Sequence, residues 1–148
     1  MEPLIFPFFE SDGGVIEPGS GTTAYNCIAW SVGRVDVWWW PDSSEETVWP
    51  ETVPREVTLA AFVAAFATVG YQLCENGELE VGWEKIALYA LAGVPTHAAR
   101  QLADGSWTSK LGRGPRVSHN TTRGVEGPLY GLVACFLRRP ISTSEESQ

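Results

Sequence analysis

An Asp-Gly turn at residues 104–105 limits the topology of this chain more than any other local signal. It joins the run H-A-A-R-Q-L to the run W-T-S-K-L, and both runs can alternate between the two faces of a strand. Asp-Gly between two such runs is typical of a β-hairpin with a two-residue turn. The hairpin requires antiparallel strands, and its turn predicts that Gln101 lies opposite Thr108 and Ala99 opposite Lys110.

The first half of the chain carries helical signals. Thr58 is a suitable N-cap, and apolar residues then recur at helical spacing up to Gly70. This spacing predicts a helix over residues 59–69. We expect its buried face to contain Leu59, Phe62, Val63 and Phe66. Helices followed by antiparallel strands predict an α+β domain, in which N-terminal helices pack on a small antiparallel sheet.

The chain of 148 residues has the length of one domain with a sizeable core. Residues 1–22 are rich in Pro, Gly and acidic side chains, and we expect them to form an irregular arm on that core. Residues 23–140 form the predicted domain. The polar residues 141–148 are expected to be a mobile tail.

Composition narrows the classes of partner. The formal net charge of −8 argues against nucleic acid, because phosphate binding requires a basic surface. The N-terminal segment lacks the pattern of a signal peptide, and no apolar run approaches the roughly 20 residues that cross a bilayer. Three cysteines without a CxxC pair argue against a disulfide framework. We therefore expect a cytoplasmic protein that binds neither nucleic acid nor membranes.

Cys27 is the one cysteine that lies outside an apolar run. It follows Asn26, a good N-cap, and Gly33 is a natural stop for a short helix. A thiol at a helix N-terminus lies at the positive end of the backbone dipoles, which favours the thiolate. Cys27 is therefore a candidate nucleophile. The alternative is that it is a small buried residue.

The two histidines differ in their setting. His97 opens the first strand of the hairpin and is a candidate general base, although such a histidine can also simply satisfy a strand-end hydrogen bond. A polar residue of the second strand, Thr108 or Ser109, is the candidate to orient its ring. His119 lies in a polar turn, where a structural role is expected. Cys27 and the histidines match no standard zinc-ligand spacing, so neither a metal nor another cofactor is predicted.

The order of these motifs resembles that of the papain-like cysteine peptidase and amidase superfamily. The resemblance spans about residues 25–139, in the segments N-C-I-A-W, T-H-A-A-R, W-T-S-K-L-G, the histidine at 119 and P-L-Y-G. The chain is similar to the compact bacterial branches, the NlpC-type and CHAP peptidases and amidases, and to a group of small bacterial domains of unassigned function. The resemblance implies a papain-like fold with the cysteine at the start of a helix and the histidine at the head of a hairpin.

By this resemblance, Cys27 is the nucleophile, His97 is the general base and Ser109 is the polar third residue. Papain has a glutamine shortly before its cysteine as an oxyanion donor, but this chain has P-G-S-G-T-T-A-Y-N there. The backbone N–H of Cys27 is then expected to act with a second donor, Tyr25 or Asn26.

Trp38, Trp39 and Trp40 lie close in sequence to the proposed nucleophile. The three rings either cover the core in place of regular structure, or form a recognition wall for a peptide or a sugar-peptide beside the nucleophile.

These patterns predict a cysteine-dependent hydrolase or acyl transferase that acts on an amide or isopeptide bond through a Cys27–His97 dyad. Its substrate is expected to be a peptide or another amide-containing molecule. The rival hypothesis is a catalytically inactive papain-like domain that binds a protein partner through its tryptophan-rich loop. The sequence does not determine the substrate or the oligomeric state.

Overall fold

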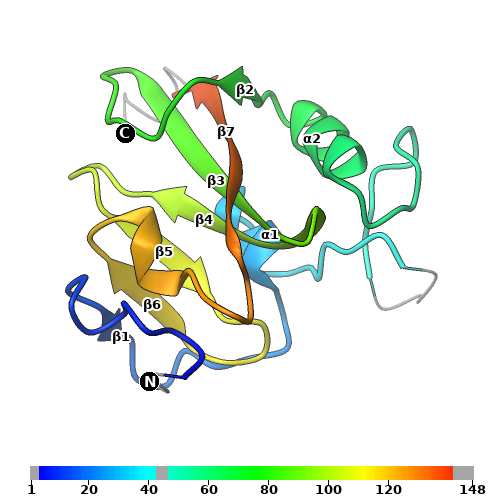
Figure 1. The fold of residues 1–148 in the computed structure, drawn as a ribbon. Helices are drawn as coiled ribbons and strands as arrows, with labels where there is room; N and C mark the ends of the chain where they lie inside the picture. Colours follow the sequence, from blue (N-terminus) through cyan, green and yellow to red (C-terminus); the bar gives the residue numbers. More distant parts are fainter. Residues whose placement is uncertain (1–3, 43–46, 142–148) are drawn as a thin grey trace.

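The computed structural model describes residues 4–42 and 47–141, which form a seven-stranded antiparallel sheet with short helices (Figure 1). The strands are β1 (Val15–Ile16), β2 (Gln72–Cys74), β3 (Trp83–Leu91), β4 (Val94–Gln101), β5 (Trp107–Lys110), β6 (Arg116–His119) and β7 (Leu132–Pro140). The helices are α1 (Cys27–Ser31), α2 (Leu59–Ala67) and the 3-10 turn η1 (Thr122–Val125). The strand order in the sheet is β1-β6-β5-β4-β3-β7-β2. Apart from residue 141, the predicted tail over residues 141–148 lies outside the described residues.

The expected papain-like α+β architecture, with N-terminal helices packed on a small sheet, is wrong because the sheet is the dominant element. Helices α1 and α2 have 5 and 9 residues, whereas β3 and β7 alone have 9 residues each. The described part of the proline-rich segment 37–58 forms a loop, held by an isolated bridge between Trp39 and Val48. The chain is therefore a β-rich domain with two small helices.

Helix α2 begins where the sequence predicts, and it buries part of the predicted face. The Thr58 side chain caps it by accepting a backbone N–H of the first turn at 3.1 Å. The residues that the helix buries are Ala61, Phe62, Ala65 and Phe66. Leu59 and Val63, which were expected to be buried as well, are only half-buried. The helix is thus rotated so that two alanines, rather than Leu59 and Val63, share the buried face with the two phenylalanines.

The two faces of the sheet carry separate hydrophobic clusters. The first cluster contains the strand residues Ile86, Leu88 and Ala98 and is covered by α1, α2 and the tryptophan-bearing loop. We name this side the helix-covered face. The second cluster contains the alternate strand residues Ala87, Tyr89 and Ala99. Phe6 and Phe9 of the N-terminal arm pack on it, and we name this side the arm-covered face.

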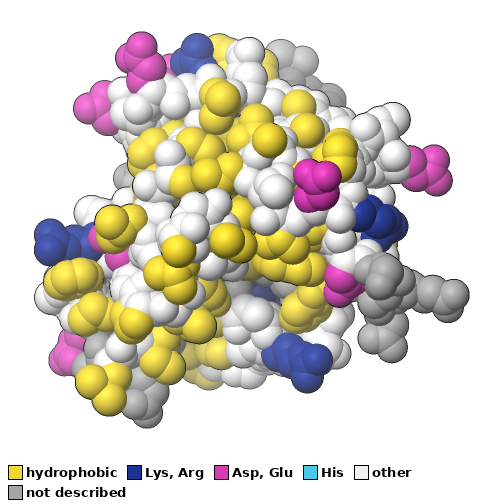
Figure 2. Space-filling model, turned by 45° about the vertical axis from the view of Figure 1, so that its right-hand side comes forward, with side chains coloured by type: hydrophobic (Ala, Val, Ile, Leu, Met, Phe, Trp, Pro, Cys, Tyr) yellow, Lys and Arg dark blue, Asp and Glu magenta, His cyan; other side chains and the backbone are white. Residues whose placement is uncertain are grey.

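The arm and α2 lie towards opposite edges of the sheet, which end in β1 and β2. In Figure 1 the arm and β1 lie beside β6, whereas α2 lies near β2 and β7. Figure 2 shows that hydrophobic side chains occupy much of the visible surface, with charged groups scattered around them. No histidine is visible there, in agreement with the burial of both histidines.

The predicted hairpin is present, but its turn is one residue longer than expected. The Leu102 N–H donates to the Ser106 carbonyl at 2.7 Å, so that residues 103–105 form the turn. Gly105 adopts a left-handed φ of 90°, as in three-residue hairpin turns that end in a glycine bulge.

The longer turn changes the strand register. Arg100, rather than the predicted Gln101, pairs with Thr108. Because side chains alternate along a strand, a slip of one residue moves every side chain of β5 to the other face. Ser109 therefore lies on the same face as His97, and Thr108 lies on the opposite face.

Candidate active site

Cys27 is the first residue of α1, and Asn26 holds it there. The Asn26 carboxamide oxygen accepts the Ala29 N–H at 3.1 Å, which caps the helix as predicted. The same oxygen accepts the Trp39 N–H at 3.0 Å, and the Asn26 amide group donates to the Trp39 carbonyl at 2.7 Å. Asn26 is thus a buried clamp between the helix and the tryptophan loop, which is not the oxyanion role expected for it.

The Cys27 thiol is buried, and burial decides its ionisation. The side chain is 5 % exposed. Hydrogen bonds from the backbone amides of Ala98, Ile28 and Cys27 itself favour the thiolate, but desolvation outweighs them and raises the pKa of Cys27 from 9.0 to about 11. The helix N-terminus therefore does not activate this thiol by itself.

A cavity of about 240 Å³ lies beside the thiol. Its lining residues are Asn26, Cys27, Trp38, Trp40, Thr96, Gly112 and Tyr130. Trp38 and Trp40 are half-buried, whereas Trp39 points inward, is 6 % exposed and packs against Trp49 with 6.3 Å between ring centroids. The structure thus brings two of the three predicted wall tryptophans to Cys27 and places the third in the core.

His97 lies on the arm-covered face, next along β4 from Ala98. It pairs with Tyr89 across the strands, and the two ring centroids are 5.3 Å apart. Its side chain is 0 % exposed, and neither ring nitrogen has a hydrogen-bond partner among the described residues. Burial, with a smaller contribution from His119, lowers the pKa of His97 well below 6.5, so that the ring is neutral.

No hydrogen bond joins Cys27 to His97, because the two side chains belong to different faces of the sheet. They nevertheless approach the same strand, since the backbone of Ala98, the residue after His97, acts to lower the pKa of the Cys27 thiol. Tyr130 contacts both regions: it lines the Cys27 cavity and stacks on His97 with ring centroids 4.1 Å apart and planes at 5°. The phenol ring therefore separates the candidate base from the cavity.

Ser109, the predicted third residue, is bonded to the other histidine. Its hydroxyl lies 2.9 Å from Nε2 of His119, and Nδ1 of His119 lies 2.7 Å from the Thr121 carbonyl oxygen. Ser109 and His119 are 0 % and 1 % exposed. From the sequence alone only a structural role is predicted for His119, because the polar residues around it indicate a turn, whereas Arg116–His119 forms strand β6.

Tyr25, the other expected oxyanion donor, does not line the Cys27 cavity. Its ring lies 5.8 Å from that of Trp30, and the Lys110 ammonium lies 5.1 Å from its centroid. The Lys110 ammonium also donates to the carbonyls of Thr22 and Gly112, at 2.8 and 2.5 Å. Tyr25 is thus part of the packing behind the cavity.

The site can be placed within a known family. A family model described as a domain of unknown function (DUF7689) matches residues 18–138. The chain belongs to the DUF7689 family. No curated protein and no solved structure matches it.

The DUF7689 match includes every residue of the candidate site, from Cys27 to Tyr130. It begins after Phe6 and Phe9, so the part of the arm that packs on the arm-covered face lies outside the match. The described residues of this DUF7689 chain contain no cluster of three metal-ligating side chains and no helix that is long and apolar enough to cross a membrane.

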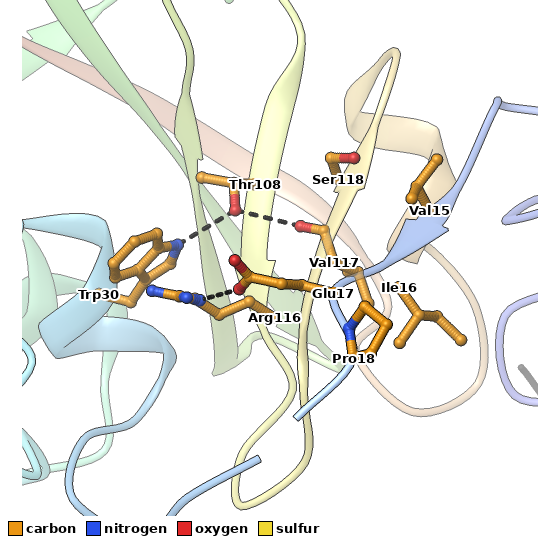
Figure 3. A pocket seen from close by; sticks show the side chains of 9 residues that line it. All are labelled: Val15, Ile16, Glu17, Pro18, Trp30, Thr108, Arg116, Val117 and Ser118. Carbon is orange, nitrogen blue, oxygen red and sulfur yellow. Dashed lines mark hydrogen bonds and ion pairs between the residues drawn. The ribbon is translucent and has the colours of Figure 1, made fainter. Parts of the chain in front are cut away.

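Another cavity of the DUF7689 domain, about 460 Å³, lies beside β1 (Figure 3). Trp30 forms one side of it, and the indole N–H donates to the Thr108 hydroxyl at 3.2 Å. Arg116 lies over the Trp30 ring and forms an ion pair with Glu17. Of the predicted site residues, this cavity is lined only by Thr108, the alternative to Ser109, and the Arg116–Glu17 ion pair joins two residues of its own wall.

Proposed function

We propose that this DUF7689 chain is a cysteine-dependent hydrolase or acyl transferase that acts on an amide or isopeptide bond, with Cys27 as nucleophile and His97 as general base. The observation that carries the proposal is the unpartnered imidazole of His97. A buried ring with two unbonded nitrogens is costly to maintain, and such groups are retained at functional sites. His97 is the neighbour in sequence of Ala98, whose backbone amide acts to lower the pKa of the Cys27 thiol.

The proposed reaction begins when Cys27 Sγ attacks the carbonyl carbon of the amide. The thiol proton passes to the free nitrogen of His97, and the new S–C bond gives a tetrahedral intermediate. The C–N bond then breaks as His97 returns the proton to the leaving amine. Water releases the acid from the resulting thioester, or an amine accepts the acyl group. The amides that face Cys27 support the oxyanion.

The reaction requires Tyr130 to move. Its ring stacks on His97 and lines the cavity, and His97 itself lies on the other face of the sheet from Cys27. We therefore infer that the closed arrangement is a resting form, in which the Tyr130 ring must swing out and the His97 ring must turn towards the cavity when substrate binds. Tyr130 belongs to a tight loop whose base is closed by two hydrogen bonds between Gly127 and Gly131. A short loop on a paired base can change its tip without disturbing the sheet.

The shape of the cavity supports a small amide-bearing group. At about 240 Å³ the cavity is smaller than the roughly 300–1,000 Å³ of drug-sized ligand sites, and aromatic rings form much of its wall. Trp38 and Trp40 are placed to hold an apolar side chain or acyl group next to Cys27. All three cysteines are free thiols, which supports the proposed cytoplasmic location.

The test is a double-mutant cycle on Cys27 alkylation by iodoacetamide, followed by peptide mass spectrometry. Tyr130→Ala is expected to speed labelling of Cys27 at pH 6.5 by about tenfold, the factor for one pKa unit, because it frees His97 to take the thiol proton. His97→Ala added to Tyr130→Ala should remove that gain. Tyr130→Phe, which keeps the stacked ring, is the matched control and should behave as the wild type.

A gain that survives in the His97→Ala/Tyr130→Ala protein would mean that Tyr130 only limits access to the thiol, and the dyad would be rejected. Cys74 and Cys135 provide internal references in the same digest, because neither lies at the cavity.

A second candidate function is a catalytically inactive domain that binds a partner through the tryptophan loop. The raised pKa of Cys27 favours it, since a neutral thiol without a base is not a nucleophile at neutral pH. This hypothesis predicts equal, slow labelling of Cys27 in all four proteins of the cycle.

A further inference from the structure

A buried serine–histidine pair lies on the same face of the sheet as His97. Ser109 is on β5 and His119 is on the neighbouring strand β6, and both are almost completely buried. Polar groups at such a position require a reason, because an apolar pair of the same size would pack there without a desolvation penalty.

The hydrogen bonds of this pair have a fixed direction. The Thr121 carbonyl can only accept, so Nδ1 of His119 carries the proton and donates to it at 2.7 Å. In the neutral ring Nε2 is then an acceptor, and the Ser109 hydroxyl donates to it at 2.9 Å. Burial lowers the pKa of His119, which keeps the ring neutral. The Ser109 hydroxyl thus uses its proton in the bond to His119, and its oxygen can still accept a hydrogen bond from another donor.

Strand alternation places that oxygen on the same side of the sheet as His97. The pairing of β4 with β5 ends at Arg100 and Thr108, Ser109 is the next residue of β5, and His97 and Ala99 are the β4 residues that follow the pairing on the same face. A diagonal neighbour across two strands is within reach of a long or aromatic side chain. The electrostatic effect of His119 on His97 agrees with this proximity.

We propose that His119 is a positioning residue: it holds the Ser109 hydroxyl so that its free lone pair accepts an N–H of His97 when that ring serves as base for Cys27. The inference rests on the proposed function. One nitrogen of His97 takes the thiol proton, and the other N–H donates to Ser109, which in turn donates to His119. The chain ends at the Thr121 carbonyl.

This arrangement explains why a serine can occupy the third position. A free hydroxyl orients an imidazole poorly, because its proton can point either towards the ring or away from it. With its proton bonded to His119, Ser109 can only accept from His97, and this favours the imidazolium form. His119 therefore acts through Ser109 and contacts neither Cys27 nor the cavity.

Two substitutions of His119 separate this role from a structural one. His119→Gln can present an acceptor where Nε2 was, so it retains the bond from Ser109 and loses the bond to Thr121. His119→Asn can retain the donor to Thr121 and loses the acceptor for Ser109. A purely structural histidine predicts that Asn, which keeps the link within its own turn, is the better replacement.

The measurement is the rate of Cys27 alkylation against pH in the Tyr130→Ala background, where His97 is released. Ser109→Ala and His119→Asn are expected to lower the rate at pH 6.5 by about tenfold, the factor for one pKa unit, while His119→Gln retains it within about threefold. Thr108→Val is the matched control, because it removes a hydroxyl of similar burial from the other face of β5 and should leave the profile unchanged.

The outcomes are distinguishable. If His97→Ala lowers the rate but Ser109→Ala and His119→Asn do not, the positioning role is rejected and the proposed function stands. If His97→Ala has no effect either, both are rejected. If Ser109→Ala does not fold, the isosteric pair Ser109→Thr and Ser109→Val replaces it: the hydroxyl-bearing Thr should keep the rate and Val should lose it, and equal rates would overturn the proposal.

Discussion

The two faces of the sheet are built differently. The helix-covered face is held by aromatic and aliphatic side chains, with Phe62 and Phe66 of α2 fully buried against it. The side chains of the arm-covered face are buried to the same degree, but His97, Ser109 and His119 are among them. The helix-covered face also buries Cys27 and Asn26, but the two buried histidines, whose ordinary pKa lies near neutral pH, both belong to the arm-covered face.

This difference indicates where the fold is maintained and where function is expected. Side chains on the helix-covered face contribute through apolar area, which does not depend on pH. The histidines of the arm-covered face are buried in the neutral form, so the same depth of burial makes that face sensitive to acid. Cys27 lies with the first face and its proposed base with the second, and β4 is the element they share.

The largest effect that tests this contrast is loss of an aromatic side chain from the helix-covered face. Phe66→Ala and Trp39→Ala are each expected to lower the free energy of unfolding by about 3–5 kcal/mol, because both rings are almost fully buried. Urea denaturation at pH 7.5 and again at pH 5.5 measures it, and the loss should be the same at both pH values. A loss that changes with pH would show that the two faces are not independent.

An intermediate effect is acid destabilisation from the arm-covered face. The pKa values of His97 and His119 are lowered in the folded chain, whereas the unfolded chain binds protons below about 6.5. The free energy of unfolding should therefore be level above pH 6.5 and fall below it, by at most about 1.4 kcal/mol per pH unit for each histidine.

Denaturation curves between pH 5 and pH 8 measure this slope. His97→Phe removes one of the two titrating rings and should reduce the slope, while Phe66→Ala is the control that leaves it unchanged. An identical slope in the wild type and in His97→Phe would contradict a neutral, buried His97.

The smallest effect is expected at the cavity wall. Trp38 is half-buried and borders Cys27, so Trp38→Ala should cost only about 1 kcal/mol of stability. It should also expose the thiol and speed its alkylation. Thermal melts of Trp38→Ala and Trp39→Ala compare their losses of stability. Similar losses for the two variants would mean that Trp38 is also part of the core.

Local signals predicted several elements of this structure correctly. The caps of both α-helices were predicted from Asn26 and Thr58, whose side chains accept backbone N–H groups within three residues of themselves. The hairpin was predicted for the same reason, since the Asp-Gly dipeptide that favours the turn lies within the turn itself. The papain-like α+β fold was wrong because strand pairing between distant segments, such as β3 with β7, leaves no local signature.

The candidate site shows the same division. The sequence marked Cys27 by its place at a helix start, and it marked Trp38 and Trp40 by their proximity to it. It also indicated His97 and Ser109, but it predicted that they pair with each other and predicted only a structural role for His119. The observed bond between Ser109 and His119 depends on two strand registers, and neither is encoded within one strand.

By itself the sequence determined what short-range interactions decide: the helix starts, the position of the hairpin and the amphipathic character of α2. Only the tertiary structure decided which side chains share a face, because one extra residue in the turn moved Ser109 to the side of His97. It also decided that Tyr130, 33 residues along the chain, stacks on His97 and separates it from Cys27. Contacts of this kind depend on packing across the whole sheet, which no local pattern specifies.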